Sequence, residues 1–95
     1  MELIDWISKW YIDNCDGDWE HTSGVLIETL DNPGWSIKID LINTPLEGKQ
    51  LAEVFVDKSE DDWLKICSDG KRFIGYGDAN KLKHLIESFK SFSQL

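Results

Sequence analysis

The stretch 24-GVLIETLDNPGWSIKIDLI-42 is the best starting point for predicting the fold. Its two halves, residues 24–30 and 35–42, are rich in Val, Ile, Leu and Thr, and the second half alternates apolar with polar side chains. A period of two is typical of a half-buried strand. Between the halves, Pro33 presets φ for the first central position of a turn and Gly34 accepts the positive φ of the second. The stretch is therefore predicted to form a β-hairpin closed by a type II turn.

Three more strands are predicted after a polar connection. Residues 51–57 alternate again, and residues 63–68 and 71–76 follow with similar patterns. Asp69-Gly70 between the last two is a strong hairpin signal. Because most of the strands are joined by tight turns rather than crossovers, we expect a mainly antiparallel sheet of about five strands.

A helix is predicted at each end of the chain. Residues 2–14 place apolar side chains at helical spacing, and a loop follows at Asn14 to Asp18. Asp78 is well placed as the N-cap of the last helix. The apolar stripe of that helix consists of Leu82, Leu85, Ile86 and Phe89. The pattern predicts an α+β fold with both helices packed on the sheet, and residues 1–95 form a single domain without repeats or linkers.

Composition favours a soluble globular protein. Hydrophobic residues make up 41% of the chain and charged residues 29%, which is close to globular norms. The first residues include Glu2 and Asp5, so the start lacks the basic and apolar regions of a signal peptide, and no apolar run approaches the length of a membrane span. Without an export signal, Cys15 and Cys67 are expected to be free thiols. We expect a cytoplasmic protein.

The formal net charge of −8 narrows the class of partner. A negative field repels nucleic acid and anionic membranes, and it attracts basic proteins and speeds their encounter. We therefore expect a basic protein partner, with no direct binding of nucleic acid or membrane. Charge of this sign also keeps small proteins soluble, which is the alternative explanation.

Three acids alternate in the segment after the first helix. Asp16, Asp18 and Glu20 match the first ligand positions of a calcium loop, but His21 stands where that loop needs Gly and Ile27 where it needs a bidentate Glu. The spacing therefore argues against a calcium site.

Other site chemistry is also poorly supported. The chain has four soft metal ligands, Cys15, His21, Cys67 and His84, but none of them form the close pairs of a structural zinc site. Glu20 beside His21 is the minimum for acid-base chemistry, yet the sequence contains no phosphate loop and no nucleophile elbow. We predict no catalytic residue, metal or cofactor.

The five tryptophans divide into two groups. Trp6, Trp10 and Trp35 lie on apolar stripes, where core packing is the default. Trp19 and Trp63 are surrounded by acids, a combination typical of the anchors and rims of protein interfaces. The alternative for Trp63 is that the N-terminal helix covers the second face of the sheet and buries it.

Four segments of the sequence carry a family resemblance: Trp10-Tyr11, Cys15-Asp-Gly-Asp-Trp-Glu-His21, Ile27-Glu-Thr-Leu-Asp-Asn-Pro-Gly-Trp35 and Phe73-Ile-Gly-Tyr-Gly-Asp78. Together they resemble immunity protein family 53 of bacterial polymorphic toxin systems, nearly from end to end. The family's Trp-Glu and Pro-Gly-Trp motifs correspond to Trp19-Glu20 and Pro33-Gly34-Trp35.

The resemblance implies a cytoplasmic protein that binds and blocks a cognate toxin, usually encoded beside it, without enzymatic activity. An acidic surface agrees with a basic toxin such as a nuclease. The candidate contact residues are acids and tryptophans from two segments: Asp16, Asp18, Trp19, Glu20, Asp61, Asp62 and Trp63. Pro33, Gly34 and Trp35 are predicted to serve folding.

Two alternatives stay open. One is a small metal-dependent or acid-base enzyme that uses Asp16, Asp18, Glu20 and His21. The other is a general protein-interaction module unrelated to toxins. The sequence carries no signal on self-association.

Overall fold

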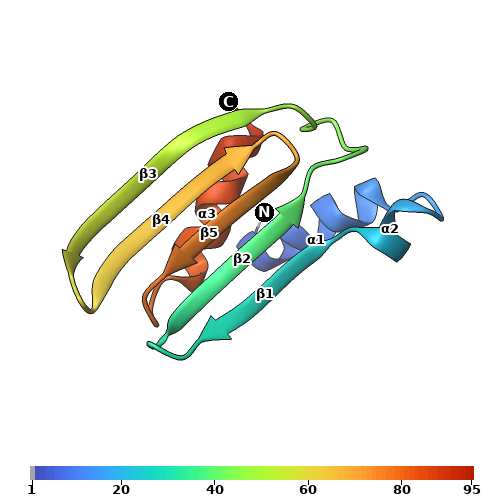
Figure 1. Cartoon of the computed structure of the whole chain (residues 1–95). Coiled ribbons are helices and arrows are strands. Elements are labelled where there is room, and N and C mark those ends of the chain that lie inside the picture. Colours follow the sequence, from blue (N-terminus) through green and yellow to red (C-terminus); the bar gives the residue numbers. More distant parts are fainter. Residues whose placement is uncertain (1) are drawn as a thin grey trace.

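The computed structural model describes residues 2–95 and contains a five-stranded antiparallel sheet backed by helices (Figure 1). The elements in chain order are α1 (Leu3–Asn14), α2 (Trp19–Thr22), β1 (Val25–Leu30), β2 (Gly34–Asp40), β3 (Gln50–Ser59), β4 (Asp62–Asp69), β5 (Arg72–Gly77) and α3 (Leu82–Ser93). The predicted α+β class, the five strands and the two terminal helices are confirmed. The short helix α2 was not predicted. None of the helices within residues 2–95 combines the length and the apolar character that a membrane span requires.

The strands lie in the order β1-β2-β5-β4-β3. The last strand is therefore the central one, and the first hairpin (β1–β2) and the longer hairpin (β3–β4) flank it. Ile37 of β2 and Ile66 of β4 both pair with Gly75 of β5. A Cβ at Gly75 would come within 2.9 Å of a Leu85 methyl of α3 and 3.0 Å of an Ile37 methyl, so the absence of a side chain there lets the helix approach the sheet.

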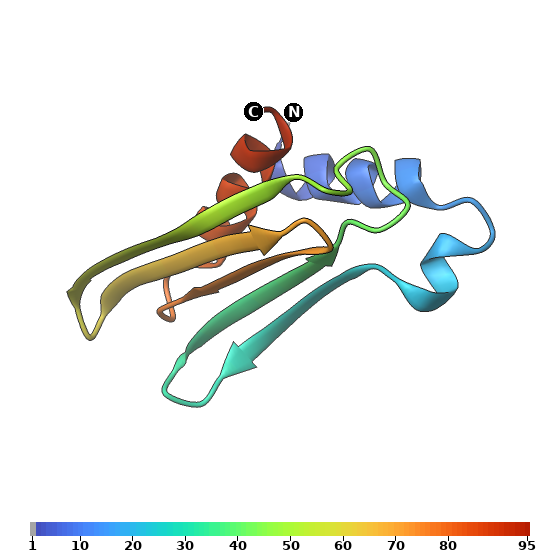
Figure 2. The ribbon, with the colours of Figure 1, turned by 45° about the horizontal axis from the view of Figure 1, so that its top comes forward.

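Both long helices cover the same face of the sheet (Figure 2). The buried cluster beneath them combines side chains of α1, α3 and the central strands: Ile7, Ile37, Ile39, Leu41, Phe73, Leu85, Ile86, Phe89 and Phe92. The predicted stripe of the last helix is thus confirmed as a core face. The N-terminal helix does not cover the second face, so the alternative burial of Trp63 by that helix is wrong. We call the uncovered side the open face.

The first hairpin closes with a different turn from the one predicted. The Asn32–Pro33 peptide is cis, and Gly34 does not adopt a positive φ, so the type II assignment is wrong. Gly34 is needed for another reason, because a Cβ there would collide with the carbonyl oxygen of Gly77 on β5. Glycine is required here because the neighbouring strand comes so close to the backbone. The sequence pattern does not reveal that contact.

Asp78 does not cap the last helix as expected. The N-cap of α3 is Lys81, which has no side-chain capping bond. The Asp78 carboxylate instead accepts hydrogen bonds from the backbone N–H of Asn80 at 2.8 Å and of Trp63 at 2.9 Å. The residue therefore joins the end of β5 to the start of β4.

Candidate partner-binding surface

The predicted contact residues lie in two separate places. Asp16, Asp18, Trp19 and Glu20 belong to α2 and the loop before it, whereas Asp61, Asp62 and Trp63 belong to the β3–β4 hairpin. These segments occupy opposite ends of a molecule that is 42 Å long (Figure 1). The structure does not bring the two groups together, so they cannot form one compact site.

Two acids of the α2 loop, Asp16 and Glu20, stabilise the conformation of the loop through hydrogen bonds to its backbone. One carboxylate oxygen of Asp16 accepts hydrogen bonds from the N–H groups of Asp18 and Trp19, both at 2.9 Å. Glu20 accepts from the N–H groups of Asp16 at 2.9 Å and Gly17 at 2.8 Å. This reciprocal arrangement resembles a capping box at the start of a helix.

These bonds also favour the charged form of both acids. The N–H groups of Trp19 and Asp18 lower the pKa of the Asp16 carboxyl. Backbone N–H groups, including those of Glu20 itself and of Asp16 and Gly17, lower the pKa of Glu20, and His21 adds a smaller electrostatic effect in the same direction. A carboxylate that accepts several backbone N–H bonds is stabilised in its ionised form.

Trp19 is not the exposed aromatic that its acidic neighbours suggested. Its side chain is only 3% exposed, and its indole N–H donates to the carbonyl of Ile42 at 2.9 Å. Its ring lies 6.0 Å from that of Trp10 and 5.9 Å from that of Tyr11, measured between centroids. The expectation of an exposed anchor is therefore wrong, because α1 and the loop after β2 enclose the ring.

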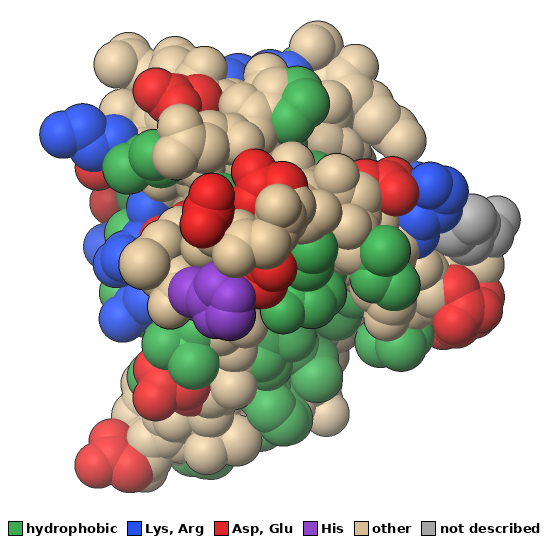
Figure 3. All heavy atoms as spheres, turned by 90° about the vertical axis from the view of Figure 1, so that its right-hand side faces the viewer, with side chains coloured by type: hydrophobic (Ala, Val, Ile, Leu, Met, Phe, Trp, Pro, Cys, Tyr) green, Lys and Arg blue, Asp and Glu red, His purple; other side chains and the backbone are tan. Residues whose placement is uncertain are grey.

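The surface over this end of the molecule is mixed rather than purely acidic. Figure 3 shows acidic side chains beside a band of hydrophobic ones at the end that carries α2. A cleft of about 250 Å³ lies between α1 and β1 and is lined by Ile7, Ser8, Tyr11 and Val25. Within residues 2–95, no group of three or more His, Cys, Asp or Glu side chains is placed to hold a metal ion, and Asp16, Asp18, Glu20 and His21 are no exception.

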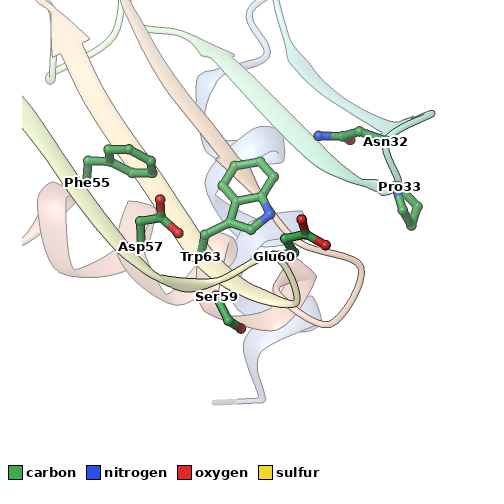
Figure 4. Close-up of a pocket in the computed structure, with 7 residues that line it drawn as sticks. All are labelled: Asn32, Pro33, Phe55, Asp57, Ser59, Glu60 and Trp63. Carbon is green, nitrogen blue, oxygen red and sulfur yellow. The ribbon is translucent and has the colours of Figure 1, made fainter.

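The other end contains a larger hollow, between the tips of the two hairpins. The tip cleft, as we call it, has a volume of about 570 Å³. Its walls come from the β1–β2 turn and from β3, the β3–β4 turn and β4: Asn32, Pro33, Phe55, Asp57, Ser59, Glu60 and Trp63. Figure 4 shows the Trp63 ring in the middle, with Asp57 and Glu60 beside it and Asn32 and Pro33 across from it.

Strand register explains why Trp63 faces this cleft. Leu64 packs against the core under the helices, so its neighbour Trp63 points to the open face. Asp57 is directly opposite Trp63 in the β3–β4 ladder, and Phe55 is opposite Lys65 two residues further along. Side chains at such positions share one face of the sheet. Trp63 is half-buried and Phe55 is 55% exposed, so both are available to a partner.

The buried residue Asp78 fixes the backbone beside Trp63. Besides accepting the Trp63 N–H, Asp78 donates its own N–H to the Trp63 carbonyl at 3.2 Å. The Lys81 ammonium lies 2.7 Å from Asp78 and 2.8 Å from Asp62, and so bridges the two acids. Asp62, a predicted contact residue, is thus partly engaged within the chain.

The contacts among Asp78, Asp62 and Lys81 shift the pKa values of all three groups. Burial by itself would raise the pKa of Asp78, but the hydrogen bonds from Lys81, Trp63 and Asn80 outweigh it and lower the pKa to about 2. The Lys81 hydrogen bond also lowers the pKa of Asp62, while its two acidic partners, Asp62 first, raise the pKa of Lys81.

The open face continues from the tip cleft along the sheet. One row across the strands joins Phe55, Lys65 and Tyr76, because Lys65 pairs with both of the others. A second row joins Leu26, Lys38, Ile74 and Cys67. Leu26 is 50% exposed, and most of the rest are half-buried. Apolar and aromatic groups spaced by charges, without a covering layer, are typical of a binding surface.

Phe55, Asp57 and Glu60 were missed as candidate residues. The available signal was strand parity, because Phe55 and Asp57 fall on the opposite side of β3 from Val54 and Val56. Strand parity identifies these residues only when the exact pairing between β3 and β4 is known. That pairing has two irregularities, one between Leu51 and Val54 and one between Asp57 and Ser59.

A protein-family model described as Immunity protein 53 matches residues 4–94 of the chain. No curated protein and no solved structure shows a significant match. The matched range contains the tip cleft, the α2 loop and the whole sheet.

Proposed function

Because the chain belongs to the immunity protein 53 family, which matches it over residues 4–94, we propose that it protects the producing cell by binding and neutralising a cognate toxin of a polymorphic toxin system. We propose further that it acts in the cytoplasm, without catalysis, by covering the toxin's functional surface. A basic toxin, such as a nuclease, fits the net charge of −8.

The observation that carries this proposal, beyond family membership, is the open face. Both long helices pack on one side of the sheet, which leaves the other side free for a partner. Phe55 and Trp63 lie there beside carboxylates, and aromatic side chains supply much of the energy at protein interfaces. We therefore place the main contact at the tip cleft and the adjoining open face.

A contact through Asp16, Asp18 and Glu20 stays a prediction. Asp16 and Glu20 accept backbone hydrogen bonds, yet their charge still contributes to the field that a basic partner meets. We propose that this loop steers the toxin and that the tip cleft holds it. Trp19 would act indirectly, by keeping the loop in place.

Co-expression tests the proposal. The chain is expressed with the toxin gene encoded beside it, and survival, complex formation and dissociation rate are measured. We expect survival only when the chain is present and a complex that withstands purification. Equal killing with and without the chain, together with no complex at micromolar concentration, would remove the proposal.

A further inference from the structure

We propose that the tip cleft is a receptor for one arginine side chain of the partner, with the guanidinium stacked on Trp63 and paired with Asp57 and Glu60. This inference rests on the proposed function, since the partner is the toxin. It adds the chemical identity of the group that is bound and the residues that recognise it.

The walls of the cleft have the composition that a guanidinium needs. Two of the seven lining residues, Phe55 and Trp63, present aromatic surface. A planar cation is attracted to the face of such rings, most strongly to that of Trp. Arginine suits the site better than lysine because its flat, delocalised group stacks on a ring while its N–H groups reach carboxylates at the edge.

The acids of the cleft are free to pair with a partner. Across the described chain, residues 2–95, the ion pairs engage Asp13, Asp40, Glu53, Asp62 and Asp78. Asp57 and Glu60 belong to none of them, and no lysine, arginine or histidine lines the cleft. Asp57 and Glu60 therefore differ from Asp16 and Glu20, whose carboxylate oxygens accept hydrogen bonds from backbone N–H groups.

Neighbouring cations do not cancel this charge. Lys81 is held by Asp62 and Asp78, and Lys65 pairs with Glu53 at 3.2 Å. Lys58 is the remaining base of the hairpin tip, against Asp57, Glu60, Asp61 and Asp62. The tip therefore keeps an excess of negative charge, which complements an arginine.

The site is also held in shape before a partner arrives. Asp78 fixes the backbone of Trp63 through hydrogen bonds at both its N–H and its carbonyl. Cross-strand pairing fixes Asp57 beside the same ring. A receptor that is already ordered loses little conformational freedom on binding, so more of the contact energy appears as affinity.

The test compares two charge-matched double variants of the full chain against the purified toxin. D57N/E60Q removes the free acids of the cleft, and D5N/E87Q removes two exposed acids of α1 and α3, on the other side of the sheet. We expect D57N/E60Q to weaken binding at least about tenfold, mainly through faster dissociation, as for a contact at the centre of an interface. We expect D5N/E87Q to change the dissociation rate less than about twofold. Circular dichroism checks that both variants are folded.

A chemical readout identifies the bound group. The toxin is treated with phenylglyoxal, which modifies arginine, in complex with the wild type and with D57N/E60Q, and the modified positions are mapped by mass spectrometry. We expect one arginine to be protected by the wild type and to react in the D57N/E60Q complex.

Each outcome decides a different point. If the wild type neither binds nor protects, the proposed function fails and this inference fails with it. If the wild type binds but both double variants dissociate alike, the cleft inference alone is wrong. Protection of no arginine, or of a lysine in a parallel acetylation experiment, would overturn the assignment of arginine.

Discussion

Asp78 and Trp63 hold each other through two hydrogen bonds, one from the Trp63 N–H to the Asp78 carboxylate at 2.9 Å and one from the Asp78 N–H to the Trp63 carbonyl at 3.2 Å. The pair ties the residue that follows β5 to the start of β4. It also positions the ring in the tip cleft, so the stability of the fold and the proposed binding site depend on the same contact.

Replacing Asp78 by Asn should destabilise the fold by about 1 to 3 kcal/mol, because a buried acceptor is weakened and Lys81 loses a partner. Asp78 is 2% exposed, so water cannot replace the lost bonds. Urea unfolding measures the change. Asp61→Asn, on the exposed tip, is the control and should stay within about 0.5 kcal/mol of the wild type. Equal effects of the two substitutions would contradict the role assigned to Asp78.

Lowering the pH should reduce the stability of the folded protein, partly because Asp78 becomes protonated. The pKa of Asp78 is about 2 in the folded chain against an ordinary value of 3.8, so its stabilising contribution is complete above 3.8 and is lost as the pH falls toward 2. The urea midpoint should therefore fall between about pH 5 and pH 2. Asp16, Glu20, Asp62 and Asp69 also have lowered pKa values and share the effect. The urea midpoint of D78N should fall less steeply with decreasing pH than that of the wild type. Equal pH dependence of the two proteins would refute the role assigned to Asp78.

Trp19→Phe and Trp63→Phe should separate folding from binding. Trp19→Phe removes the indole N–H that bonds to the Ile42 carbonyl, and it should cost about 1 to 3 kcal/mol while leaving toxin affinity nearly unchanged in the folded protein. Trp63→Phe reduces the aromatic wall of the tip cleft, so it should weaken binding with a smaller loss of stability. Thermal unfolding and dissociation rates of both variants provide the comparison. The reverse pattern would show that the α2 loop is the main contact.

Gly34→Ala should be destabilising by about 1 to 3 kcal/mol, because its Cβ would meet the Gly77 carbonyl of the neighbouring strand. Gly24→Ala is the matched control, since a Cβ there would lie 3.9 Å from the Tyr11 ring, an ordinary contact. We expect that control to be neutral or slightly stabilising. Chemical unfolding of both variants would show whether close strand approach, rather than turn conformation, explains Gly34.

Local patterns in the sequence were sufficient for the elements of the fold. Alternation along residues 35–42 and the apolar stripe from Leu82 to Phe89 predicted strand and helix because side-chain direction repeats with the backbone period. The same rule places Trp63 and Leu64, as neighbours in one strand, on opposite faces of the sheet. Local patterns also failed in specific ways: the short helix α2, the turn at Pro33 and the role of Asp78 were not recognised.

The amino-acid sequence was enough to predict an acidic α+β chain with five strands and two long helices, and a family resemblance that the family model confirms. Which tryptophan is buried, and which acids lack a partner within the described residues, became clear from the packing of the elements. Trp19 and Trp63 both stand among acids, but α1 and the Ile42 carbonyl enclose the first, whereas both long helices leave the face of the second uncovered. Exposure depends on segments distant along the chain, and local composition does not contain that information.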